Sequence, residues 1–241
     1  MAVENDVKPR RPRRSKADIE EAIQKAATAQ IKKKGFSLAL VTDIVKRAKI
    51  EPIVFYNRYK NLDEFYDGFV KQYDYWLSDL IHASSTDVHT EEGLARMLEA
   101  LFEKLLSDKV MTELMRWEIA EGNHITERTA RLRELHAVEL TEHYNGLLRS
   151  DDTDMVATAT LMVAGLYYMI LHKDRSALGG IDINTTEGKK RIHNACRTIS
   201  SLFFRRREAE RRIKSIASNM RAEGISEEVI ARCLDSADSA S

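Results

Sequence analysis

Proline and glycine are both scarce in this sequence of 241 residues. It has three prolines, of which only Pro52 lies beyond residue 12, and ten glycines. Proline removes a backbone donor and clashes with the preceding helical turn, so its scarcity leaves room for long unbroken helices. β-Branched and aromatic residues also do not gather into alternating runs, which argues against a sheet. The sequence therefore predicts an all-α protein.

Cysteine and the usual catalytic motifs are missing as well. Cys196 and Cys233 do not have the spacing of a metal motif, and no Gly-rich phosphate loop or nucleophile elbow is present. We therefore expect no enzyme, no cofactor and no metal, and the low cysteine content favours the reducing cytoplasm. One alternative stays open. His136, Glu139 and His143 lie at helical spacing, as in a helical-bundle metalloenzyme, although a second helix with such a motif is not evident.

Long apolar runs are limited to one segment, residues 155–171, which carries no charged side chain. As a helix it would span about 25 Å, which is marginal for a hydrocarbon core of ~30 Å. We predict a helix buried in the protein or in a dimer interface, and no membrane association. The basic, polar N-terminus has no apolar core, which excludes a secretory signal.

The charge is present but unevenly distributed. The formal net charge is zero, yet residues 1–60 carry 15 Lys and Arg against 7 Asp and Glu. Residues 61–187 carry 11 against 24, and residues 188–241 carry 12 against 7. A basic head on an acidic body is typical of a protein that meets a polyanion with one end only. A dispersed surface charge without a partner is the alternative.

The spacing of apolar residues predicts ten helices. The first begins after the capping residue Ser15 and ends at Gly35. A long fourth helix begins after Asn61 and continues to about residue 84. The others are expected at about 38–48, 51–59, 90–107, 109–120, 126–149, 153–172, 186–222 and 226–235.

Two short helices joined by a tight turn, after a longer helix, are typical of a helix-turn-helix DNA-binding unit. The segment over residues 18–68, which includes Gly35-Phe36, VTDIVKRA at 41–48 and IEPIVFYNRYKNLDEF at 50–65, resembles the N-terminal signature of the TetR (tetracycline-repressor) family. The aromatic pair Tyr56 and Tyr59 falls at the family spacing after the turn. The resemblance implies an all-α protein with an N-terminal helix-turn-helix domain and a C-terminal helical domain for ligand binding and dimerisation.

Three positions depart from the family pattern. Lys49 stands where the family usually has glycine, so it has to accept a positive φ. Glu51 replaces a serine or threonine cap, and Leu62 replaces a lysine that often touches phosphate. These departures leave open an adaptor protein that does not bind DNA.

The resemblance implies which residues contact DNA. Val54 would offer a methyl contact to thymine, and Tyr56 would donate to a phosphate. Phe55 and Tyr59 face the other way and are expected in the core. The residues carried over to DNA contact are Thr42, Pro52, Ile53, Val54, Tyr56, Asn57, Arg58 and Lys60.

The resemblance also implies a homodimer, formed through the last two long helices at 153–172 and 186–222. Family members usually hold a small-molecule effector among the middle helices, although aromatic and methionine residues at helical spacing are more often plain core. The candidate residues for this pocket are Tyr73, Trp76, Leu101, Met111, Met115, Trp117, Tyr144, Tyr167 and Tyr168.

We therefore expect a cytoplasmic, homodimeric regulator of transcription that binds double-stranded DNA. It would be a repressor that a small-molecule effector releases from a palindromic operator. The alternatives are a DNA-binding or adaptor protein without an effector, and the metalloenzyme. The sequence assigns no role to the Arg205–Arg212 cluster, where a solvated, ion-paired surface is favoured, or to the helix at 226–235. The expected parts are a basic arm at 1–14, the helix-turn-helix at 15–61, the regulatory and dimerisation domain at 62–222, and a helix and tail at 223–241.

Overall fold

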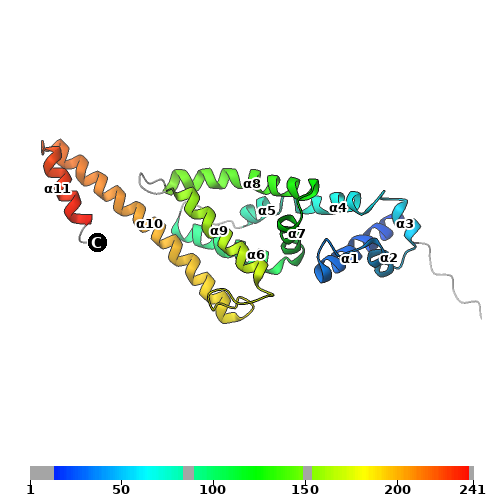
Figure 1. Ribbon diagram of the computed structural model, residues 1–241. Coiled ribbons are helices and arrows are strands. Elements are labelled where there is room, and N and C mark those ends of the chain that lie inside the picture. The colour runs from blue at the N-terminus through cyan, green and yellow to red at the C-terminus, as the bar shows by residue number, and fades with distance from the viewer. Residues whose placement is uncertain (1–13, 84–89, 149–153, 239–241) are drawn as a thin grey trace, which may run out of the picture. The chain divides into compact units, whose positions relative to one another are not determined.

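The computed structural model describes residues 14–83, 90–148 and 154–238 (Figure 1). Within these ranges the fold is all-α, as predicted, and the one β-type pairing is a bridge between Leu178 and Ile181. Residues 1–13 of the expected basic arm lie outside the described part of the chain. No helix in the described ranges is long and apolar enough to cross a membrane.

The helices follow the chain in a simple order, with one short 3-10 turn among them. Their bounds are α1 Lys16–Lys34, α2 Val41–Ala48, α3 Pro52–Tyr56, α4 Leu62–Val70, η1 Lys71–Tyr73, α5 Trp76–Ala83, α6 Glu91–Ser107, α7 Lys109–Ala120, α8 His124–Leu148, α9 Met155–His172, α10 Thr186–Ala222 and α11 Glu227–Asp238.

Both ends of α1 are fixed by the residues that the sequence indicates. The Ser15 hydroxyl accepts a hydrogen bond from the Asp18 backbone N–H, and the Asp18 carboxylate accepts one from the Ser15 N–H. This reciprocal pair satisfies two donors that the helix itself leaves free. Gly35 ends the helix with φ 80°, and a Cβ there would lie 3.2 Å from Glu113 Oε2. Both the backbone and the space therefore favour glycine at this position.

The second helix begins later than expected, at Val41 instead of residue 38. The preceding turn is held by the buried Tyr66, whose hydroxyl donates to the carbonyls of Phe36 at 3.1 Å and Ala39 at 2.7 Å. Because Tyr66 supplies hydrogen bonds to these two carbonyls, they do not need partners within a helix. The chain can therefore remain in a turn as far as Leu40.

The prediction of one continuous helix from 62 to 84 is wrong. The helix α4 ends at Val70, η1 follows, and α5 begins at Trp76. This break coincides with the division of the chain into two compact units after Asp74. Because Phe69 and Val70 are buried in one unit and Trp76 in the other, packing overrides the local helical preference.

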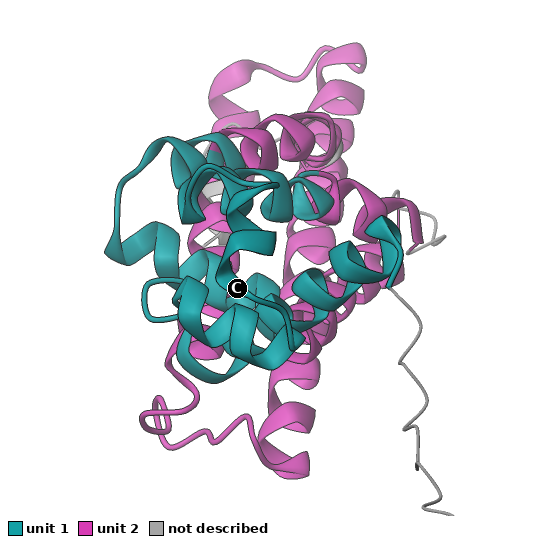
Figure 2. Ribbon diagram, turned by 90° about the vertical axis from the view of Figure 1, so that its right-hand side faces the viewer, with its two compact units in different colours: residues 1–74, 109–130 teal, residues 75–108, 131–241 magenta. Residues whose placement is uncertain are grey.

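The first unit consists of Met1–Asp74 and Lys109–Ala130, and the second of Tyr75–Asp108 and Arg131–Ser241 (Figure 2). The first unit has an aromatic core. Trp117 on α7 stacks on Phe36 with 4.9 Å between ring centroids, and Tyr66 and Phe69 on α4 meet Phe36 edge-on. Since all these rings are nearly inaccessible to solvent, α4 and α7 form one core with the loop that links α1 to α2.

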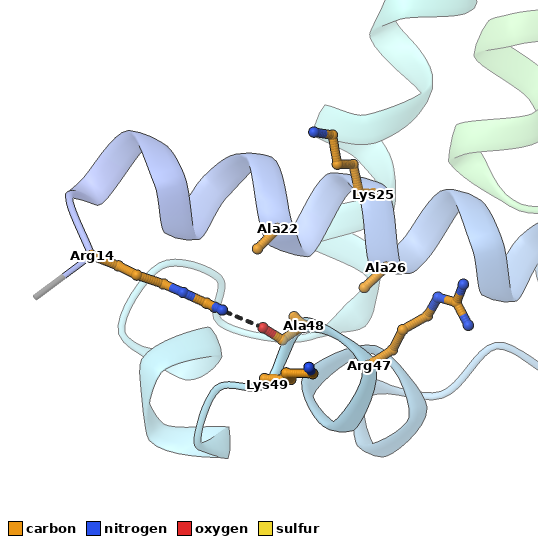
Figure 3. Close-up of a pocket in the computed structure, with 7 residues that line it drawn as sticks. All are labelled: Arg14, Ala22, Lys25, Ala26, Arg47, Ala48 and Lys49. Carbon is orange, nitrogen blue, oxygen red and sulfur yellow. Dashed lines mark hydrogen bonds between the residues drawn. The ribbon is translucent and has the colours of Figure 1, made fainter. Parts of the chain in front are cut away.

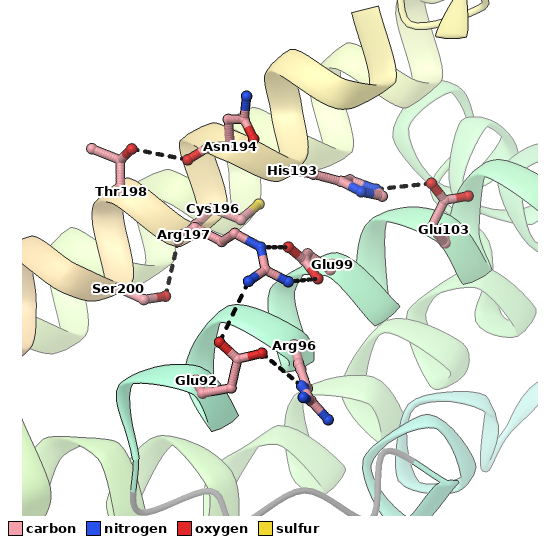
Figure 4. A network of polar contacts seen from close by, with 10 residues as sticks. All are labelled: Glu92, Arg96, Glu99, Glu103, His193, Asn194, Cys196, Arg197, Thr198 and Ser200. Carbon is pink, nitrogen blue, oxygen red and sulfur yellow. Dashed lines mark hydrogen bonds and ion pairs between the residues drawn. The ribbon is translucent and has the colours of Figure 1, made fainter. Parts of the chain in front are cut away.

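In the second unit, α6 packs along α10 and is linked to it by ion pairs (Figure 4). The Arg197 guanidinium donates to both carboxylate oxygens of Glu99, at 2.7 and 3.2 Å, and to Glu92 at 3.4 Å. Hydrogen bonding from Arg96, together with the charge of Arg197, lowers the pKa of the Glu92 carboxyl. The buried Cys196 lies on the same side of α10, and its burial raises the pKa of its thiol to about 11.

The outer half of α10 continues beyond its packing on α6, and α11 turns back along it (Figure 1). Ile230 of α11 is buried there. In the basic cluster on this half, Arg206 pairs with Glu210 at 3.1 Å and Arg212 with Glu208 at 3.0 Å.

Candidate nucleic-acid interface

The helix α3 is short and is anchored by one side chain. Pro52 occupies its first turn, where a missing N–H costs nothing. Phe55 is 0% exposed and packs against Tyr59 and Phe65, with ring centroids 5.2 and 5.6 Å apart. Because Phe55 fixes the inner side of α3, residues on its other side face solvent. Ile53 is 58% exposed and Tyr56 51% exposed.

Most residues that the sequence assigns to DNA contact are exposed in the structure. Val54 and Arg58 are the two exceptions and are partly buried. The exposed residues are Thr42 on α2, and Pro52, Ile53, Tyr56, Asn57 and Lys60 in or after α3.

Arg58 follows α3 and folds back on it. Its guanidinium donates to the Val54 carbonyl at 2.8 Å, and its Nε lies 4.0 Å from Glu20 Oε2 on α1. A cation at this position satisfies a terminal carbonyl and opposes the negative end of the helix dipole. In this conformation Arg58 therefore caps α3, which the sequence did not indicate.

Tyr59 ties the end of α3 to α1. Its hydroxyl donates to the Glu20 carboxylate, and its ring packs edge-on against Phe65 at 5.0 Å. Burial, and after it the bond to Glu20, raises the pKa of the Tyr59 phenol well above its usual range. The phenol therefore stays neutral and remains a donor.

The start of α4 fixes the exit from α3. The Asn61 side chain accepts from the Glu64 N–H at 2.9 Å, and the Glu64 carboxylate accepts from the Lys60 N–H. These bonds fix the first turn of α4, and Phe65 at the end of that turn is buried against Phe55. Local capping and a buried contact thus hold α3 in one orientation.

The turn between α2 and α3 has the conformation expected from the sequence. Lys49 adopts φ 55° and ψ 50°, which confirms a positive φ at the place where the family usually has glycine. The Ile50 N–H donates to the Val45 carbonyl at 3.1 Å, which closes the end of α2.

A hollow of about 320 Å³ lies between α1 and the end of α2 (Figure 3). Arg14 crosses it and donates to the Ala48 carbonyl at 2.9 Å. Apart from the lysine in place of glycine at position 49, the sequence carries no sign that Arg14, Arg47 and Lys49 line one hollow. The lining residues are Arg14, Ala22, Lys25, Ala26, Arg47, Ala48 and Lys49.

The candidate effector residues are divided between the two units. In the first unit, Met111 and Trp117 belong to the core, and the Trp117 indole donates to Glu121 at 2.9 Å. In the second, Trp76 is buried and donates to Asp108 at 3.2 Å, whereas Tyr168 is exposed. The structure therefore does not bring all nine into one unit. Tyr73 and Met115 lie in the first unit, and Leu101, Tyr144 and Tyr167 in the second.

The imidazoles considered for a metal engage aromatic rings. His136 stacks on Tyr75, with centroids 5.1 Å apart, and His143 meets Tyr144 edge-on at 5.3 Å. Within the described ranges, no three potential metal ligands come together.

The geometry defines an all-helical protein whose helix-turn-helix presents a short, exposed third helix. No family model matches the sequence, and no curated protein matches it. Solved structures share the fold. A TetR family transcription regulator from Marinobacter aquaeolei VT8 has a TM-score of 0.53 and 16% identity, over 76% of this chain and 95% of that one.

Two further solved structures of transcription regulators share the fold of this chain. The fatty acid degradation regulator FadR from Bacillus halodurans has a TM-score of 0.51 and 18% identity, over 77% of this chain and 97% of that one. The regulator FadR from Bacillus subtilis, in complex with stearoyl-CoA, has a TM-score of 0.51 and 15% identity, over 75% and 97%. This chain therefore has the fold of the TetR-type transcription regulators, as its N-terminal residues predict.

Proposed function

We propose that this chain is a homodimeric, cytoplasmic regulator of transcription that binds a two-fold symmetric DNA site. The observation that carries the proposal is the exposure of Ile53 and Tyr56 on α3, with Phe55 fully buried behind them. Apolar side chains are costly to leave in water, and on a short helix in a basic segment they suit the major groove. The fold shared with transcription regulators supports the same conclusion.

Most of the residues assigned to DNA contact match a chemical group on a duplex. The hydroxyls of Thr42 and Tyr56 suit phosphate oxygens, and the Asn57 amide suits an adenine edge. Ile53 and Val54 suit thymine methyl groups. To contact DNA, the Arg58 guanidinium would have to give up its hydrogen bond to the Val54 carbonyl and donate to a phosphate or a guanine instead. That exchange would be favourable only in the DNA complex.

The homodimer is proposed from two exposed faces in the second unit. On α9 small residues and Leu161, which is 75% exposed, occur at helical spacing. On α10 the stripe includes Leu202 and Ile216, both exposed. Two such faces from each of two subunits make a four-helix bundle. The exposed residues along these two faces are Ala157, Thr160, Leu161, Ala164, Gly165 and Tyr168 on α9, and Ala195, Thr198, Leu202, Ala209 and Ile216 on α10, where Arg191, Arg205 and Arg212 lie at the same helical spacing.

We further propose that the protein is a repressor and that an effector releases it from DNA. Such release requires an effector that binds the two conformations of the dimer with different affinity. The acidic middle of the chain favours a neutral or cationic compound. Stearoyl-CoA, the ligand in the Bacillus subtilis FadR structure, is an anion and is therefore the informative first comparison.

The test begins with selection of bound duplexes from random DNA, followed by binding measurements on the double variant Tyr56→Ala/Arg58→Ala. We expect at least a hundredfold loss of affinity, because a groove contact and a phosphate contact are removed. The control Tyr75→Ala/Arg175→Ala removes the same residue types from exposed positions in the second unit and should bind as the wild type. Undiminished binding by the first variant refutes the interface.

The effector is tested separately, by thermal shift with a compound library that includes stearoyl-CoA. A compound that stabilises the protein and weakens duplex binding supports release. Specific duplex binding that no stabilising compound alters favours a constitutive DNA-binding protein. Failure to select any duplex favours the adaptor.

A further inference from the structure

Lys49 holds a backbone conformation that is unfavourable for a lysine. Among the described residues, it is the one non-glycine residue with a positive φ. The side chain of an L-residue crowds the following carbonyl in this region, and glycine avoids the penalty. Because backbone strain tends to occur at functional positions, a lysine in this conformation is a candidate for a functional side chain.

The surroundings of Lys49 are basic and open. Figure 3 shows Arg14 reaching toward Ala48 at the end of α2, with Lys49 beside it, while Arg47 extends to the other side and Lys25 on α1 extends away from them. Three of the seven residues that line the hollow are alanines, whose small side chains leave space between the basic residues. None of the lining residues is acidic.

The charges at the hollow are available to a ligand. Lys25 pairs with Glu21, but Arg14, Arg47 and Lys49 make no ion pair within the described ranges. Arg14 donates one N–H to the Ala48 carbonyl, which holds the guanidinium in place and leaves further donors free. The hydrogen bonds from Ser15, and after them the nearby charge of Arg14, lower the pKa of the Asp18 carboxyl. The charges of Arg47 and Lys49 add to the local potential and attract an anion.

We propose that this hollow binds a phosphate group, held by Lys49 and Arg14, with the positive charge of Arg47 nearby. A guanidinium fork and an ammonium together match the oxygens of a phosphate. The proposal rests on the proposed DNA binding, because the group we favour is a backbone phosphate of the bound duplex. Lys49 lies three residues before Pro52, at the entry to the helix assigned to the groove. A free phosphate compound has the same chemistry and is the other possible source.

The decisive variant is Lys49→Gly, which is expected to move two quantities in opposite directions. Removal of the strained side chain should raise the Tm by about 2–4 °C. Loss of one phosphate contact should weaken duplex binding about three- to tenfold near 0.1 M salt, and should reduce the slope of log K against log salt by about one. A residue with only a structural role would not separate stability from affinity in this way.

Two further variants serve as controls. Lys49→Arg keeps the charge and should retain affinity within about threefold and most of the salt slope. Lys190→Gln removes an exposed lysine from α10 in the second unit, and should leave both quantities unchanged. If Lys49→Gly retains full affinity and salt slope while Tyr56→Ala/Arg58→Ala loses binding, the DNA interface stands and a duplex phosphate at the hollow is refuted.

The source of the phosphate is decided without DNA. Thermal shift with inorganic phosphate, against chloride at equal ionic strength, compares the wild type with Lys49→Gly. Stabilisation of the wild type alone, combined with full duplex binding by Lys49→Gly, assigns the hollow to a free phosphate. No phosphate effect, combined with full duplex binding by Lys49→Gly, overturns the proposal.

Discussion

The two compact units differ in how they cover their apolar surface. The first unit closes an aromatic core around Phe36, Phe65 and Trp117, and its exposed apolar residues include Ile53 and Tyr56 on α3. In the second unit, the long helices α9 and α10 each bury one side and leave large apolar side chains in solvent, among them Leu161, Leu202 and Ile216. Both units therefore leave apolar side chains in solvent: the first on α3, which we assign to DNA, and the second along α9 and α10, which we assign to a partner subunit.

The largest expected effect comes from opening the closed core. Phe65 is fully buried among Phe55, Tyr59, Tyr66 and Phe69. We expect Phe65→Ala to lower the free energy of unfolding by about 3–5 kcal/mol, through lost burial and the cavity that remains. Urea denaturation monitored by circular dichroism measures the loss.

A matched substitution on the surface shows whether this loss depends on burial. Leu38 is exposed in the same unit, so Leu38→Ala should change the free energy of unfolding by less than about 0.5 kcal/mol. Equal losses in the two variants would contradict the proposed difference between core and surface.

The next effect tests the open surface of the second unit. Leu161→Glu on α9 places a charge at the centre of the proposed dimer face, and should weaken self-association about a hundredfold or more. Sedimentation velocity across a range of concentrations measures it. Leu135→Glu, on the equally exposed face of α8, should leave association unchanged. If both variants or neither dissociate, α9 is not the dimer face.

A smaller effect is expected at the join between the short third helix and the core. Asn61→Ala removes the acceptor of the Glu64 N–H and should lower the free energy of unfolding by about 1 kcal/mol. Asn145→Ala, at an exposed position inside α8, should change it by less than about 0.5 kcal/mol. Chemical denaturation of the two variants distinguishes the cap from a general effect of losing asparagine.

The smallest effect concerns acid. The hydrogen bond from Lys34, at 2.8 Å, lowers the pKa of the Asp43 carboxyl below its ordinary 3.8. A depressed carboxyl contributes stability above its unfolded pKa and loses it as the pH falls through the folded value. As the pH is lowered below about 4, the Tm of the wild type should therefore decrease, and the Tm of Asp43→Asn should decrease slightly less steeply. Identical acid profiles would show that this pair contributes nothing.

The proposed interface could be predicted in part. Helical periodicity predicts Phe55 inside and Tyr56 outside, because consecutive side chains on a helix point in different directions around its axis. The conformation of Arg58 could not be predicted, since its contact with Glu20 depends on how α3 meets α1. The hollow depends on residues 14 and 49, which only the packing of α1 against α2 brings together.

The sequence by itself determined the helical class, the charge asymmetry and the capped starts of helices such as α1 and α4. These depend on composition and on hydrogen bonds within a few residues, which act before any distant contact forms. The tertiary structure decided the interruption between Val70 and Trp76, the basic hollow, and which faces of α9 and α10 stay in solvent. Those features require the burial of one segment against another that is remote in the chain, and local pattern carries no information on that pairing.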